Sequence, residues 1–209
     1  MPLDLWLAFV AASTALLLIP GPTVLLVLSY ALSKGRSVAL ASAAGVALGD
    51  LIAMTASLAG LGALVLTSAA LFTALKWIGA AYLVWLGIRL IRSAPTGGLT
   101  LPQSADITAR QVFGHAAAVT ALNPKSIAFF IAFVPQFITP AEPLVPQFAI
   151  LIATFVSLAA LNTLAYALAA DRLRRTLARP AILTWITRAG GSALIAMGIA
   201  TATLRRSTP

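Results

Sequence analysis

The chain has 209 residues, 60% hydrophobic and only 9% charged, which excludes an ordinary soluble domain, since such domains are closer to one quarter charged. Because one bilayer crossing takes roughly 20 apolar residues, the sequence supplies about six crossings and leaves no room for a separate soluble domain. The 14 basic and 5 acidic residues give a net charge of +9, an excess that in a membrane protein indicates cytoplasmic loops rather than nucleic-acid binding.

Six apolar runs predict six transmembrane helices, at about residues 5–32, 38–66, 71–91, 113–138, 147–170 and 183–204. The first run follows Asp4 rather than a basic segment and is too long for a signal-peptide core, so we expect a retained helix. The polar segment 93–111 divides the spans into two groups of three. We therefore predict one transmembrane domain over 1–209, with a first repeat at about 1–92, a cytoplasmic linker at 93–111 and a second repeat at about 112–209.

The basic residues predict how the chain is oriented. They gather in the first, third and fifth loops, as Lys34 and Arg36, then Arg89, Arg92 and Arg110, then Arg172, Arg174, Arg175 and Arg179. Short loops rich in Lys and Arg stay in the cytoplasm, so the odd-numbered loops are predicted inside and both termini outside. Arg205 and Arg206 argue against an outside C-terminus. The cluster around Arg172 has a second interpretation, as a site for anionic lipid or a partner.

The first and fourth spans each contain a proline break near the middle. The first has Pro20, Gly21 and Pro22 in succession, and the fourth has Asn123 followed by Pro124. Proline lacks an N–H and clashes with the preceding turn, so neither span is expected to continue as one helix. Asn123 is a strong N-cap type and Pro124 suits the first position of a new half-helix.

These breaks occupy corresponding places, because each opens a three-helix half and an odd number of spans makes the halves opposite in orientation. Matched interruptions of this kind point to a transporter binding site near the midplane, although prolines that only kink the helices are the alternative. The N-termini of two half-helices would offer positive dipole ends to a carboxylate or another anion. We expect six helices in two inverted repeats, with the substrate held at the breaks. The expected contacts are Pro20, Gly21, Pro22, Thr23, Asn123, Pro124 and Lys125.

Asp50, in the second span, is the strongest single functional signal. A carboxylate at membrane depth costs several kcal/mol unless it is protonated, paired or hydrated. It is therefore a candidate to carry a coupling proton or to bind a substrate ammonium, with a fixed ion pair to Lys125 as the structural alternative. Lys125 could instead neutralise a substrate carboxylate. Asn162, inside the fifth span, is a secondary candidate.

The sequence lacks the groups that an enzyme or an ATP-driven pump needs. His115 is the single histidine, it has no serine or carboxylate motif beside it, and five scattered acids cannot complete a metal site. No cysteine is present, and no glycine-rich phosphate loop or dinucleotide fingerprint occurs. We therefore predict no enzyme activity and no cofactor, and expect any energy to come from an ion gradient.

Four motifs in order make the chain resemble the lysine exporter family of bacterial amino-acid efflux proteins, in particular its homoserine/threonine exporter branch. These motifs are residues 19–22, 45–50, 76–87 and 123–137. The resemblance implies a bacterial inner-membrane exporter of amino acids or close derivatives, driven by protons or by the membrane potential. Thr23 stands where many relatives have Asn, which alters one polar contact.

The partners that this interpretation implies are an amino-acid-like substrate, protons and membrane lipid, with no nucleic acid. Small residues on the second span would also permit a homodimer. Phe129, Phe130, Phe133 and Trp85 suggest a small, mostly apolar pocket. The alternative function is a passive small-solute channel or a lipid scramblase that uses the same broken helices.

Overall fold

The computed structural model describes residues 1–19, 21–34, 38–67, 69–94, 107–139, 142–170 and 179–203. The helices in these segments are α1 (Leu3–Leu18), α2 (Pro22–Lys34), α3 (Ala39–Thr67), α4 (Ala69–Arg92), α5 (Ala109–Ala121), α6 (Pro124–Ala132), the short 3-10 helix η2 (Val134–Phe137), α7 (Leu144–Leu168) and α9 (Pro180–Thr203). Several residues with a predicted role lie outside the described segments, namely Pro20, Arg36, Arg172, Arg174, Arg175, Arg205, Arg206 and most of the linker.

Three helices in the described segments are long and apolar enough to cross a membrane by themselves. They are α3 over Ala39–Gly62, α4 over Thr73–Arg92 and α7 over Leu144–Leu168. A fourth candidate is α1 with the first part of α2, a pair bent by 58° at its break. These helices confirm the predicted helical membrane protein, whereas the six-span inverted repeat stays a prediction.

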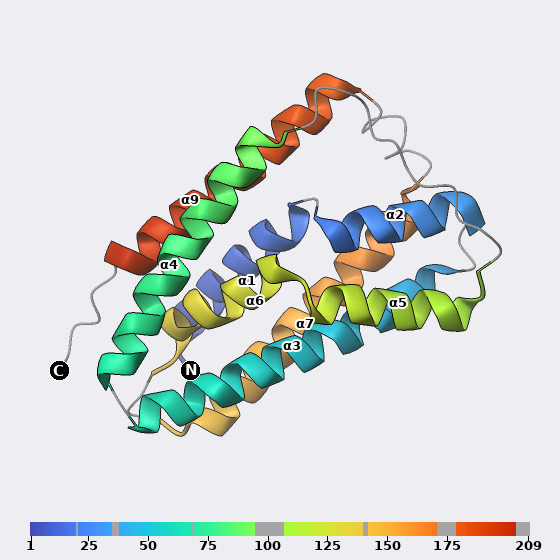
Figure 1. Ribbon diagram of the computed structural model, residues 1–209. Coiled ribbons are helices and arrows are strands. Elements are labelled where there is room, and N and C mark those ends of the chain that lie inside the picture. The colour runs from blue at the N-terminus through green and yellow to red at the C-terminus, as the bar shows by residue number, and fades with distance from the viewer. Residues whose placement is uncertain are drawn as a thin grey trace.

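Both predicted helix breaks are present. α1 ends at Leu18, Ile19 has an extended backbone with ψ of 117°, and α2 begins at Pro22. α5 ends at Ala121, and α6 begins at Pro124 after an extended Asn123 with ψ of 110°. Figure 1 shows the two helices of each pair following one another with the interruption between them. Each pair is therefore two helices separated by a break, and their inner ends are available to build a site.

The bundle packs around α3, which contacts α5 along one side and α7 along another, while α4 runs beside α9 (Figure 1). Gly49 lets α3 approach α5 closely, since a Cβ atom there would lie 2.6 Å from the carbonyl oxygen of Ala117. Gly87 of α4 and Gly191 of α9 meet in the same way. The backbone oxygen of each lies where a Cβ atom on the other would be. These glycines have the packing role that small residues commonly have in membrane helices.

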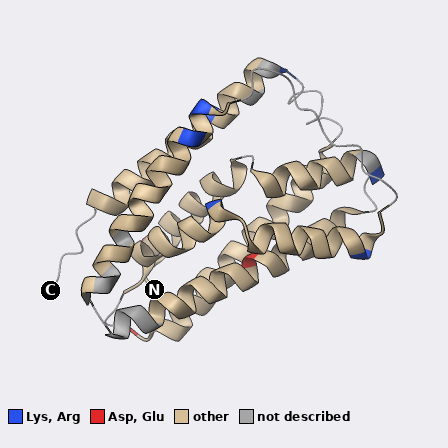
Figure 2. Ribbon diagram, in the orientation of Figure 1, with Lys and Arg blue, Asp and Glu red and all other residues tan. Residues whose placement is uncertain are grey.

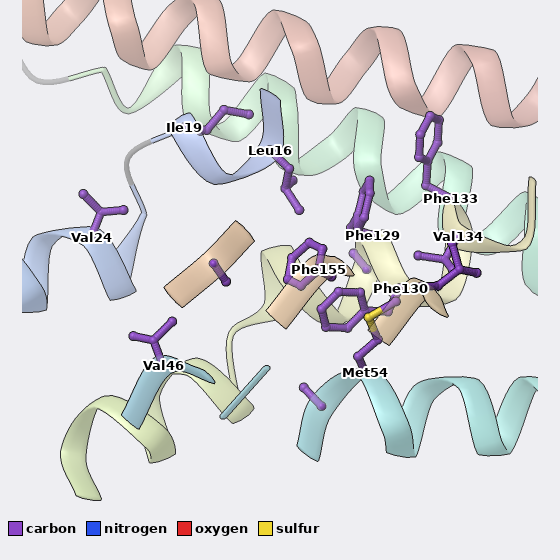
Figure 3. Close-up of a cluster of buried hydrophobic side chains, with 14 of the residues drawn as sticks. Leu16, Ile19, Val24, Val46, Met54, Phe129, Phe130, Phe133, Val134 and Phe155 are labelled. Atoms are coloured by element: carbon purple, nitrogen blue, oxygen red, sulfur yellow. The ribbon is translucent and has the colours of Figure 1, made fainter. Parts of the chain in front are cut away.

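A cluster of phenylalanine rings fills the core beside the second break. Phe129 and Phe130 of α6 are fully buried and pack on Phe155 of α7, with ring centroids 5.9 and 4.8 Å away (Figure 3). Phe133 continues this cluster 5.4 Å from Phe129. Aromatic pairs at such distances stabilise a core beyond their burial alone, so α6 is held rigidly just after Asn123 and Lys125.

Candidate functional site

A small polar cavity lies where the two breaks approach α3 and α7. Its volume is about 30 Å³, room for about one or two water molecules. The residues around it are Leu16, Leu17, Thr23, Val24, Val46, Asp50, Thr120, Asn123, Lys125, Ser126, Asn162 and Thr163. The structure thus brings together five residues that the sequence singled out from distant positions: Thr23, Asp50, Asn123, Lys125 and Asn162.

Asp50 lies on this cavity inside the helical bundle. Its side chain is 2% exposed, and its Oδ1 atom has no hydrogen-bond partner among the described residues. Figure 2 shows a red segment on α3 and a blue one at the start of α6, both within the bundle. Burying a carboxylate oxygen without a hydrogen-bond partner costs free energy. Such an arrangement is typical of a group that binds a ligand or a proton.

Lys125 bonds the broken first helix rather than Asp50. Its Nζ atom donates to the carbonyl oxygens of Leu16 at 3.0 Å and Ile19 at 2.9 Å. Within the described residues, no ion pair joins Lys125 to Asp50, so the fixed pair considered as the structural alternative is wrong. Both side chains nevertheless line the same cavity. A cation at this place also complements the negative end of the α1 dipole.

The carbonyl oxygens of Leu17 and Leu18, which lie between Leu16 and Ile19, accept hydrogen bonds from side chains of α7. The Nδ2 atom of Asn162 donates to the Leu17 oxygen, and the hydroxyl of Tyr166 donates to the Leu18 oxygen, each at 3.2 Å. A helix that ends inside a membrane leaves such carbonyls without partners unless side chains reach them. Asn162 therefore has a capping contact in addition to its place on the cavity. Tyr166 was missed by the sequence interpretation, because nothing local in α7 reveals a partner almost 150 residues away.

Thr23 connects the two breaks through hydroxyl contacts. Its Oγ1 atom accepts a hydrogen bond from the Nδ2 of Asn123 at 3.2 Å and lies 3.3 Å from the Oγ1 of Thr120 on α5. The Oδ1 of Asn123 accepts from the backbone N–H of Lys125 at 3.1 Å, which is the predicted N-cap of α6. Thr120, another residue missed from sequence, completes this polar link between the halves of the chain.

Asn123 and Lys125 also line a second cavity, of about 160 Å³. Its wall holds Gly21, Pro22, Leu86, Arg89, Leu90, Ser93, Asn123, Pro124, Lys125 and Leu194. Gly21 lies directly against the lysine, since a Cβ atom there would be 3.5 Å from Nζ. Gly21, Pro22 and Pro124, all predicted to contact substrate, thus face this larger cavity rather than the one around Asp50.

The aromatic residues expected at the pocket lie elsewhere. Phe129, Phe130 and Phe133 line neither of these cavities and belong to the core cluster. Trp85 is 49% exposed and stacks against Tyr82 and Arg89.

The Nδ1 of His115 forms a hydrogen bond with the hydroxyl of Tyr30. In the described part of the chain, no three His, Cys, Asp or Glu side chains come together as metal ligands.

Comparison with known proteins gives one consistent family. The profile of the LysE type translocator family matches residues 14–205. The chain is 35% identical to the homoserine/homoserine lactone efflux protein of Salmonella typhimurium, with 99% of this chain and 100% of that protein covered. It is also 35% identical to an uncharacterized membrane protein of Vibrio cholerae, over 98% of this chain and all of that protein. A leucine efflux protein of Klebsiella pneumoniae is 29% identical over 64% of this chain and 63% of its own length. No solved structure matches the chain.

Proposed function

The chain belongs to the LysE type translocator family, and we propose that it is a secondary transporter that exports amino acids or close derivatives across the bacterial cytoplasmic membrane. Members of this family are translocators, so the protein is a transporter and not an enzyme. Homoserine, homoserine lactone and leucine appear in the names of its relatives, which favours a small amino-acid-like substrate. Two inverted three-helix repeats, with the odd-numbered loops in the cytoplasm, would give the alternating access that export requires.

One observation carries this proposal: a buried carboxylate, one oxygen of which has no partner among the described residues, shares a polar cavity with both helix breaks. Asp50 and Lys125 provide opposite charges there, and Thr23, Asn123 and Asn162 provide uncharged polar groups. A zwitterion needs this combination, since its ammonium requires an anion and its carboxylate requires donors. The starts of α2 and α6 add the positive ends of two half-helix dipoles.

The size of the cavities suggests how a substrate would reach Asp50. The cavity at Asp50, of about 30 Å³, holds only about one or two water molecules. The second cavity, of about 160 Å³, which shares Lys125 and Asn123 with it, is large enough for a small solute. We propose that substrate first occupies the larger cavity and that separation of the two breaks then opens the path to Asp50. Protonation of Asp50 is the proposed coupling event, because it would remove the attraction for the substrate ammonium.

Transport by purified protein in sealed proteoliposomes tests the function. A panel of radiolabelled amino acids is offered with and without an imposed proton gradient, beside protein-free liposomes as control. We expect at least one small amino acid to accumulate uphill only when the protein and the gradient are both present. A passive channel or scramblase would equilibrate solute or lipid without accumulation, so flux that never exceeds equilibrium would contradict the proposal.

A further inference from the structure

The larger cavity contains a basic residue that the sequence assigned only to loop orientation. Arg89, in the last turn of α4, lines it together with Lys125, and none of the ten lining residues is acidic. Pro22 and Pro124, the first residues of α2 and α6, lie in the same wall. The cavity therefore combines two cations with the positive ends of two half-helices, which makes it attractive to an anion.

The guanidinium of Arg89 lies against an aromatic ring. Its Cζ atom lies 5.3 Å from the ring centroid of Trp85, a cation–π contact one helical turn back. Among the described residues, no carboxylate pairs with it. A guanidinium stacked on an aromatic face keeps the N–H groups at its edge available, and that planar fork matches the two oxygens of a carboxylate.

Lys125 provides a further donor to the same space. Two of its three ammonium hydrogens are used by the carbonyls of Leu16 and Ile19. The third has no partner among the described residues, and the ammonium lies in the wall shared by the two cavities. A carboxylate bound between Arg89 and Lys125 would leave the rest of a small zwitterion next to Asn123, on the way to Asp50.

We propose that Arg89 is a specificity-determining residue that binds the substrate carboxylate in the larger cavity, together with Lys125. This inference rests on the proposed function and narrows it: the recognised group is a free carboxylate, and substrates that lack one gain nothing from Arg89. Arg92 is the matched control residue for the role of Arg89 in loop orientation. It lies in the same last turn of α4 but does not line the cavity.

The test compares Arg89→Gln with Arg92→Gln, which remove the same charge from the same helix turn. Each variant is reconstituted and assayed with L-homoserine and L-leucine, and with homoserine lactone and L-leucinamide as counterparts without a carboxylate. We expect Arg89→Gln to raise KM for the two amino acids about 10-fold or more, the size of one charge-assisted contact. KM for the lactone and the amide should stay within about twofold of wild type, and Arg92→Gln should behave as wild type with all four probes.

Arg89→Lys keeps the charge and the orientation signal but loses the planar fork, so an intermediate KM for the amino acids is expected. Equal KM values for Arg89→Gln and Arg92→Gln, with wild-type export intact, would overturn the inference and leave the proposed function standing. An equal rise for all four probes would also overturn it, because it would indicate a structural role. Failure of the wild-type protein to transport any amino acid of the wider panel would overturn both proposals.

Discussion

The Nζ atom of Lys125 lies 2.9 Å from the carbonyl oxygen of Ile19, a hydrogen bond between residues 106 positions apart. A side chain from the first turn of α6 thus caps the end of α1, so the second break holds the first in place. Movement of α6 relative to α1 has to break this bond. The two interruptions therefore form one unit rather than two independent kinks.

Replacing Lys125 by Met tests this cap. The substitution keeps the length of the side chain but removes the donor from the carbonyls of Leu16 and Ile19. We expect a loss of about 1–3 kcal/mol in the free energy of unfolding, the cost of leaving buried carbonyls without a partner. Unfolding in detergent measures it, with Arg110→Gln, an exposed charge at the start of α5, as control. Wild-type stability for Lys125→Met would contradict the cap.

Gly49→Ala is expected to destabilise the contact between α3 and α5. The added Cβ atom would lie 2.6 Å from the Ala117 oxygen and 2.7 Å from the Cβ of Thr120, so the helices have to move apart at a cost of about 1–3 kcal/mol. Gly60→Ala on the same helix is the matched control, since nothing lies within 4 Å of its Cβ position. Thermal unfolding in detergent should separate the two variants, and equal melting temperatures would argue against close packing at Gly49.

Thr23→Val tests the polar link between the breaks. Valine has nearly the same shape but cannot accept the hydrogen bond from Asn123, so the amide is left with an unsatisfied donor. We expect export to fall about 10-fold, equivalent to roughly 1.4 kcal/mol and within the range for one lost buried partner. Thr23→Ser, which keeps the hydroxyl, should retain most of the activity. Comparable export by the valine and serine variants would show that the hydroxyl is dispensable.

The breaks were predictable from sequence because their cause is local. Pro22 and Pro124 cannot continue a helix, and Asn123 is a strong N-cap whatever surrounds it, so both half-helix starts follow from a few adjacent residues. Asp50 was recognisable for a related reason, since an acid within a long apolar run has to be explained in any fold.

The partners of these residues were not predictable, because they depend on tertiary geometry. Opposite charge suggested that Lys125 would pair with Asp50, yet the lysine instead reaches carbonyls that exist as acceptors only because α1 ends at Leu18. The phenylalanines of α6 were expected at the pocket, but the face they occupy is set by α7. From its position in the third loop, Arg89 was predicted only to orient the chain in the membrane. It lies on a cavity only because α4 packs against α6.

Asp50→Asn is the most direct test of the central claim, that this buried carboxylate couples export to protons. Asparagine fills the same space but cannot take up or release a proton. Leu51→Ala, at a neighbouring residue that is 42% exposed, serves as control. In proteoliposomes with an imposed proton gradient, we predict that Asp50→Asn loses uphill accumulation of substrate while the protein stays folded in the membrane and Leu51→Ala accumulates normally. Uphill accumulation by Asp50→Asn at the wild-type rate would contradict the account.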